Sequence, residues 1–148
     1  MTEETISKFM VNEHGQILAL LMGFRREANK NDAQEAFNKL KKKQERHVLA
    51  EEKAIMMLMS RGKRFSVMST ILEQHEELRS IMLDIQDYLQ RSLDDYEKSI
   101  KNLLDLMKKH IVLEDKEFYP KLDKELAGTE RKIIFEELKE AILGNIIK

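Results

Sequence analysis

The sequence predicts an all-α protein, namely an up-down-up-down four-helix bundle with an additional C-terminal helix. Apolar residues recur at helical spacing almost throughout the 148 residues, whereas the alternation and Asn-Gly turns typical of strands are missing. Hydrophobic residues make up 42% and charged residues 36%, with one Pro and five Gly, a balance typical of long helices with one apolar stripe. Short connections require neighbouring helices to run antiparallel.

The first two helices are expected near residues 4–28 and 32–60. Their stripes contain the following residues: Met10, His14, Ile17, Leu21 and Phe24, then Phe37, Leu40, His47, Ile55 and Leu58. The polar segment 29–32 predicts a turn between them, and the Gly-containing segment 60–63 ends the second helix.

The third and fourth helices are expected near residues 66–91 and 93–119. Their stripes contain the following residues: Ile71, His75, Leu78, Met82, Ile85 and Leu89, then Ile100, Leu103, Met107, His110 and Phe118. Ser92 is expected to cap the fourth helix, with Asp94 and Asp95 in its first turn. Pro120 is expected to bend or end that helix because it lacks the amide proton.

Gly128 separates a C-terminal helix expected near residues 129–146, with Thr129 as its cap. Its broad apolar face consists of Ile133, Ile134, Phe135, Leu138, Ile142 and Ile146. This face should pack across the bundle or against a second copy of the chain, which leaves a homodimer through this helix open. We therefore expect one domain over residues 1–148, with the bundle at about 4–122.

Charge and cysteine content exclude several classes of function. Lys and Arg number 26 and Asp and Glu number 27, so no net field attracts nucleic acid or a membrane surface. The absence of Cys excludes disulfides, thiolate nucleophiles and cysteine-ligated clusters. No secretion signal or membrane-spanning segment is found, so we expect a cytoplasmic protein without nucleic-acid or membrane partners.

The chain contains four histidines, and each successive pair is centred near a predicted turn. In an antiparallel bundle His14, His47, His75 and His110 would therefore lie at one depth. The two halves also repeat: aligning His47 with His110 pairs Val48 with Ile111, Glu51 with Glu114, and Glu52 with Asp115. A duplicated hairpin with one ligand set in each half predicts a site for two metal ions.

The predicted ligands are four imidazoles and two carboxylates. Glu51 and Glu114 each follow a histidine by four residues, so the imidazole and carboxylate of each pair point the same way on a helix. Such carboxylates can bridge two cations at about 3.5–4 Å, with a solvent-derived oxygen as the third bridge. This donor set suits iron, manganese or zinc. A ferritin-type site is disfavoured because no carboxylate stands three residues before any of the histidines.

The order His, His-x3-Glu, His, His-x3-Glu, followed by Phe118-Tyr119-Pro120, resembles the hemerythrin-like (HHE cation-binding) domain family over residues 5–125. The resemblance implies a non-haem di-iron centre with an oxo or hydroxo bridge. It makes the four histidines terminal ligands and Glu51 and Glu114 the bridges. Asp115 is the alternative bridge, because it has the offset of the bridging Asp in the animal proteins, and Glu117 is a spare carboxylate.

One departure from the animal oxygen carriers stands at Arg79, where those proteins have a fifth histidine. The site is then more similar to bacterial iron-centre repair proteins, although we expect this protein to lack their Cys-containing N-terminal domain. Arg79 either extends its charge to solvent or pairs inward with a bridging carboxylate and attracts an anionic ligand.

The resemblance implies a binding protein whose di-iron centre takes O2, NO or a related small ligand for sensing, storage or oxidative and nitrosative stress defence. The alternatives are a redox-active di-iron enzyme that reduces NO or peroxide, an iron donor in iron-centre repair, and a structural metal site. Whether the protein is an enzyme stays open, and we favour a binding protein because no glycine-rich phosphate loop or serine elbow is present.

Overall fold

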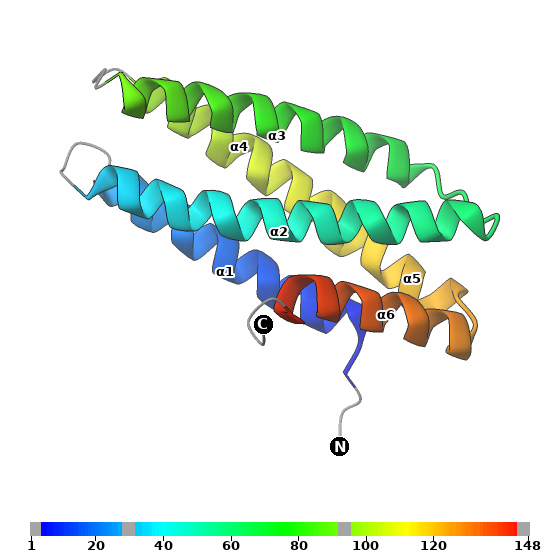
Figure 1. Ribbon diagram of the computed structural model, residues 1–148. Coiled ribbons are helices and arrows are strands. Elements are labelled where there is room, and N and C mark those ends of the chain that lie inside the picture. The colour runs from blue at the N-terminus through cyan, green and yellow to red at the C-terminus, as the bar shows by residue number, and fades with distance from the viewer. Residues whose placement is uncertain (1–3, 28–31, 92–95, 145–148) are drawn as a thin grey trace.

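Four long helices form the bundle in the computed structural model, which describes residues 4–27, 32–91 and 96–144 (Figure 1). They are α1 (Ile6–Glu27), α2 (Ala33–Ser60), α3 (Val67–Gln90) and α4 (Glu97–Leu113). A π-helical turn, η1 (Glu114–Phe118), continues α4 into α5 (Tyr119–Glu125), and α6 (Gly128–Leu143) follows. No strand occurs in these ranges, and the predicted all-α bundle with an additional C-terminal helix is confirmed.

The helices pack in the order that short connections predict. α1 contacts α2, α2 contacts α3, and α3 contacts α4, while α4 also contacts α1 and so closes the ring. Figure 1 shows the four helices side by side along one direction, with α6 beside α2. Side chains from all four helices can therefore meet along the bundle axis.

The helix ends agree with the prediction to within a few residues, except at the end of α4. The turn after α2 is built around Gly62, whose positive φ of 79° suits a residue without a side chain. Thr129 was expected to cap the last helix, but that prediction is wrong: α6 begins at Gly128, after Ala127, and has no side-chain cap. The predicted cap at Ser92, with Asp94 and Asp95, lies outside the described residues.

The end of α4 differs most from the expectation. The helix was expected to reach residue 119, but it widens at Glu114 into the π-helical turn and then continues as α5. The backbone N–H of Tyr119 donates to the carbonyl of Glu114, five residues earlier. Pro120 lies in the first turn of α5, where its missing amide proton costs little. The proline therefore follows a local widening of the helix and does not end it.

Two apolar clusters fill the bundle, and a polar layer lies between them. One cluster contains Phe24, Phe37 and Ile85 toward one end of the bundle. The other contains Met10, Leu58 and the buried side of α6. The polar layer contains the following buried residues: His14, His47, Glu51, His75, His110 and Glu114. The apolar clusters on both sides shield these side chains from water.

The last helix packs on its own bundle. Ile134, Leu138 and Ile142 are buried in the second apolar cluster, and α6 contacts α2. Ile133 is 38% exposed, and Ile146 lies outside the described residues. Of the two expected uses of this face, packing across the bundle is the one observed, while a homodimer through the helix stays a prediction.

Candidate metal centre

The polar layer is built from the six side chains singled out in the sequence. They are His14 on α1, His47 and Glu51 on α2, His75 on α3, His110 on α4, and Glu114 at the start of η1. None is more than 3% exposed. Buried imidazoles and carboxylates need partners, because burying a charge without one costs several kcal/mol, of the order of the stability of a domain.

These side chains form two groups that share the same carboxylates. His14 and His47 lie together with Glu51 and Glu114, each offering a ligand atom within 4.8 Å of the others. His75 and His110 form a second group of the same kind with the same two carboxylates. Each group could hold a metal cation, and the two groups have different imidazole pairs but share the same two carboxylates.

Each shared carboxylate reaches both imidazole pairs. Glu114 places Oε1 3.0 Å from His14 Nε2 and Oε2 3.2 Å from His110 Nε2. Glu51 Oε1 lies 3.4 Å from His47 Nε2 and 3.2 Å from His75 Nε2. The π-helical turn begins at Glu114, directly after the last α-helical residue, so this carboxylate projects inward beside His110.

Two buried atoms in the second group lack the partner that they need. His110 Nδ1 pairs with Gln74 Oε1 at 2.7 Å, so Nδ1 carries the proton and Nε2 has a free lone pair. Nε2 and Glu114 Oε2 lie 3.2 Å apart, yet neither makes a hydrogen bond to any described residue. Two lone pairs that face each other repel unless a cation or proton lies between them. A metal ion would satisfy both atoms, so the donor set fits the predicted cation.

The outer nitrogens of three histidines are held by further side chains. His14 Nδ1 lies 2.9 Å from Asp115 Oδ1, and His75 Nδ1 lies 2.9 Å from Glu52 Oε2. The two contacts are equivalent in the internal repeat, which pairs His14 with His75 and Asp115 with Glu52. In each contact, the histidine and the carboxylate come from different halves of the sequence. Partners of this kind fix the ring and leave the other nitrogen free for a metal. Asp115, the alternative bridge, thus lies on the outer side of His14, while the spare carboxylate Glu117 is exposed.

Comparison with protein families matches residues 5–122 to the Hemerythrin HHE cation binding domain. The chain belongs to this family. The match spans the bundle and the whole polar layer, and the family resemblance expected from the sequence is confirmed. No curated protein and no solved structure matches the chain. Metal-cation binding is thus a property that this hemerythrin domain shares with its family.

Arg79 was expected either to extend its charge to solvent or to pair with a bridging carboxylate, and its observed position matches neither expectation fully. Its guanidinium pairs with Glu52 Oε1 at 2.7 Å and also contacts Glu76, while 38% of the side chain stays exposed. It therefore points inward, but to the carboxylate that holds His75 Nδ1 and not to either shared carboxylate. In this hemerythrin domain Arg79 neutralises Glu52 and fixes it against His75.

Tyr119 is a site residue that the sequence reasoning missed. Its buried hydroxyl donates to Glu51 Oε2, lies 2.9 Å from Glu114 Oε1, and is 3.1 Å from His14 Nε2. Residues five apart lie on different sides of an α-helix, so Glu114 and Tyr119 would not meet in one. The π-helical turn, with its hydrogen bond over five residues, brings them together. Pro120 was the available signal for an irregular turn here.

Burial and the shared carboxylates shift the proton affinities of the layer. Burial lowers the pKa of His14, but its contacts with Asp115 and Glu114 outweigh this effect and raise it to about 10. Burial raises the pKa of Glu51, but the charge and contacts of His47 and His75 hold it well below its ordinary value. Without metal, the site of this hemerythrin domain therefore holds a protonated His14 imidazole and an ionised Glu51 carboxylate.

Metal binding is expected to release protons. Because His14 has a pKa of about 10 when no metal is bound, it carries a proton at pH 7.5 that a metal ion must displace. Apparent metal affinity should then rise as the pH approaches 10, about tenfold per pH unit for each proton released. When the metal-free protein is titrated with Zn²⁺ in a weakly buffered solution that contains a pH indicator, at least one proton per chain should be released. His14→Ala should release one proton fewer. Zn²⁺ binding without any change in pH would contradict this prediction.

Among residues 4–27, 32–91 and 96–144, no helix is long and apolar enough to cross a membrane.

Proposed function

We propose that this hemerythrin domain holds two iron ions and binds O2, NO or a related small ligand at them, for sensing, storage or defence against oxidative and nitrosative stress. The observation that carries the proposal is the sharing of Glu51 and Glu114 between two imidazole pairs. His14 and His47 would hold one ion, His75 and His110 the other, and the two carboxylates would bridge them. A solvent-derived oxo or hydroxo group is the expected third bridge.

The donor set is one that iron accepts, as manganese and zinc also do, and the resemblance to hemerythrin-like domains is the reason for proposing iron. Each position offers two imidazole nitrogens and two shared carboxylate oxygens, and no soft sulfur donor exists in the chain. Non-haem iron sites with few histidine and carboxylate ligands keep positions open for a small molecule. Iron supplies the redox change and the open position, while the protein supplies the fixed nitrogens, the bridging oxygens and a dry surrounding.

The surrounding of the polar layer suits a binding protein. Apolar clusters on both sides exclude water, which limits side reactions of a bound ligand with water or protons. Asp115, Glu52 and Gln74 hold the outer nitrogens of three ligating rings, so the rings need not reorient when a small ligand arrives. A cytoplasmic location, expected from the sequence, stays part of this proposal.

The test is anaerobic loading with Fe²⁺, followed by addition of O2 or NO while the visible spectrum is recorded. Reversible charge-transfer bands that disappear when the gas is removed would support a binding protein. Consumption of the gas with release of product would replace the proposal with a redox enzyme. A protein that takes up Zn²⁺ but no iron, and stays colourless, would replace it with a structural metal site. The Glu114→Ala variant, treated in the same way, is the control for iron bound outside the centre.

A further inference from the structure

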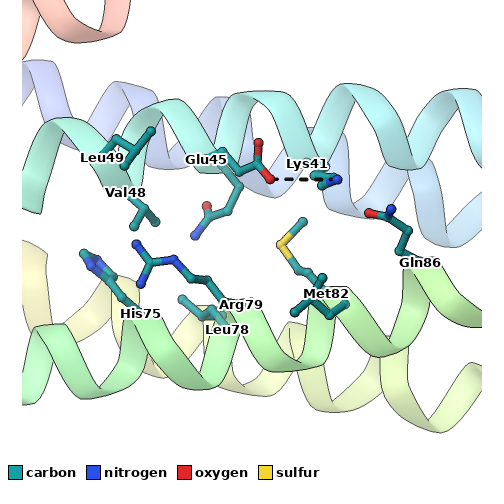
Figure 2. Close-up of a pocket in the computed structure, with 11 residues that line it drawn as sticks. Lys41, Glu45, Val48, Leu49, His75, Leu78, Arg79, Met82 and Gln86 are labelled. Carbon is teal, nitrogen blue, oxygen red and sulfur yellow. Dashed lines mark ion pairs between the residues drawn. The ribbon is translucent and has the colours of Figure 1, made fainter.

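A cavity lies between α2 and α3, outside the polar layer. Its volume is about 290 Å³, which is close to the lower end of the range for pockets that bind small organic molecules. Figure 2 shows it between the two helices, with His75 at one end and Gln86 at the other. Lys41 and Val48, which both line it, are seven residues apart on α2. The cavity therefore extends about 10 Å along the helix, at about 1.5 Å per residue.

The candidate metal centre offers this cavity no bonding atom. His75 contacts Glu52 through Nδ1 at 2.9 Å and Glu51 through Nε2 at 3.2 Å, so both of its ring nitrogens are in use. The imidazole therefore presents ring carbon to the cavity. A molecule in the cavity would be held by other groups than a metal or its ligands, which makes the cavity a separate site.

Two amide oxygens in the cavity wall lack hydrogen bonds. Gln44 is 4% exposed, and neither its Oε1 nor Gln86 Oε1 has a hydrogen-bond partner in the described part of the chain. The internal repeat pairs Gln44 with the buried Met107, so bundle packing does not require a polar side chain at this position. Burial of an amide without a partner is costly. An O–H or N–H group of a bound molecule would satisfy the Gln44 oxygen.

The charged groups that line the cavity already have partners. Lys41 Nζ lies 3.9 Å from Glu45 Oε1. Arg79 pairs with Glu52 at 2.7 Å and also with Glu76. A charged molecule would therefore find no unpaired counter-charge among these groups, and its burial would be costly. The remaining wall is apolar and consists of Val48, Leu49, Leu78, Met82 and Leu83. The lining thus favours an uncharged, largely apolar molecule with one donor group.

Two lining side chains favour an aromatic ring. Figure 2 shows the Met82 sulfur between the two helices and the Arg79 guanidinium near Val48 and His75. A thioether makes favourable contacts with aromatic rings, and a guanidinium stacks on their faces. An apolar cavity of about 150 Å³ is large enough for benzene. The larger cavity here has room for one ring with small substituents.

We propose that the cavity between α2 and α3 binds an uncharged molecule with one aromatic ring and a hydroxyl group, that is, a simple phenol. The hydroxyl donates to Gln44 Oε1, and the ring packs against Leu78 and Met82. This site goes beyond the proposed function and does not depend on it, because neither iron nor a gas bound to iron takes part.

Three probes that share one ring test which group the cavity recognises. Phenol, toluene and benzoate are added to the metal-free and the Zn²⁺-loaded protein, and binding is followed by NMR of the methyl groups of Val48, Leu78 and Leu83. We expect phenol to bind with a Kd of about 1 mM or lower and about three- to tenfold more tightly than toluene. Benzoate should bind at least about tenfold more weakly than phenol. Zn²⁺ should leave the phenol affinity unchanged.

Gln44→Met tests the proposed hydrogen bond. The variant introduces the residue that stands at the matched position of the other half, and the two side chains are similar in size, so the fold should be retained. Phenol and toluene should then bind about equally well. Gln16→Met, at an exposed position of α1 that does not line the cavity, is the matched control and should keep the preference for phenol.

The unchanged protein decides the matter if Gln44→Met does not fold. Nuclear Overhauser contacts should then connect the ring protons of phenol with the methyl groups of Val48 and Leu78. Contacts to another part of the chain would overturn the inference, and so would the absence of phenol binding or a preference for toluene. Phenol binding that requires Zn²⁺ would place the phenol at the metal centre and would overturn it as well.

A second copy of the chain is the competing occupant of this surface. Leu49 and Leu83 at the cavity are each 63% exposed and could be covered by a dimer contact. In that case their methyl signals would change with protein concentration and phenol would not shift them, which would contradict the inference. A protein that binds phenol as expected but takes up no O2 or NO would refute the proposed function and leave the phenol site intact.

Discussion

Replacing Glu114 with alanine is expected to reduce the iron content from about two ions per chain to fewer than one. The two oxygens of this carboxylate lie 3.0 Å from His14 Nε2 and 3.2 Å from His110 Nε2, so each would serve a different ion. Its loss removes a ligand from both positions at once. It also removes negative charge between two cations that bridging carboxylates hold about 3.5–4 Å apart. Iron analysis after anaerobic loading and desalting measures the effect.

Asp115→Ala is the matched control, because it removes the neighbouring carboxylate. Asp115 contacts His14 Nδ1, the nitrogen turned away from the shared carboxylates. Loss of such an outer partner typically weakens metal binding about 10- to 100-fold and leaves the stoichiometry unchanged. The pair of variants also decides between the two carboxylates considered as bridges. Two ions in Glu114→Ala together with none in Asp115→Ala would assign the bridge to Asp115.

Removal of the metal is expected to lower the melting temperature by about 8–16 °C. A ligand present at a thousand times its Kd stabilises the folded state by about 4 kcal/mol, and for a domain of this size each kcal/mol shifts Tm by about 2–4 °C. The physical reason is local: without cations, four imidazoles and two carboxylates stay buried with lone pairs such as those of His110 Nε2 and Glu114 Oε2 unsatisfied. Calorimetry with and without a chelator measures the difference.

Glu114→Ala provides the control for this second prediction as well. If stabilisation comes from ions at the shared carboxylates, added metal should leave the Tm of this variant unchanged to within a few degrees. An equal rise in the variant and in the unchanged protein would place the stabilising ion elsewhere. Equal melting temperatures of the metal-free and metal-loaded unchanged protein would contradict the prediction directly.

The fold and the six central side chains could be predicted from the sequence because both depend on regular spacing. Helical periodicity placed His14 and His47 on buried stripes, and the equal distances from histidines to turns placed them at one depth. The structure brings together all six predicted side chains. The internal repeat also pairs Asp115 with Glu52, the two carboxylates that contact the outer nitrogens of His14 and His75.

The parts that could not be predicted depend on departures from that regularity. Tyr119 enters the site only because the helix widens by one residue per turn before Pro120. Gln74, which holds His110, has Glu13 as its counterpart in the repeat, yet Glu13 pairs with Lys43 at 2.7 Å and leaves His47 Nδ1 without a hydrogen bond in the described chain. Such choices among nearby partners follow from three-dimensional packing.

The central claim is that two ions share Glu51 and Glu114. X-ray absorption of the protein loaded anaerobically with Fe²⁺ tests it most directly, because the fine structure reports neighbouring metal atoms. We expect about two irons per chain, nitrogen and oxygen neighbours only, and a metal–metal distance of about 3.5–4 Å. A single iron per chain, or two irons without a metal neighbour in that range, would contradict the shared-carboxylate arrangement.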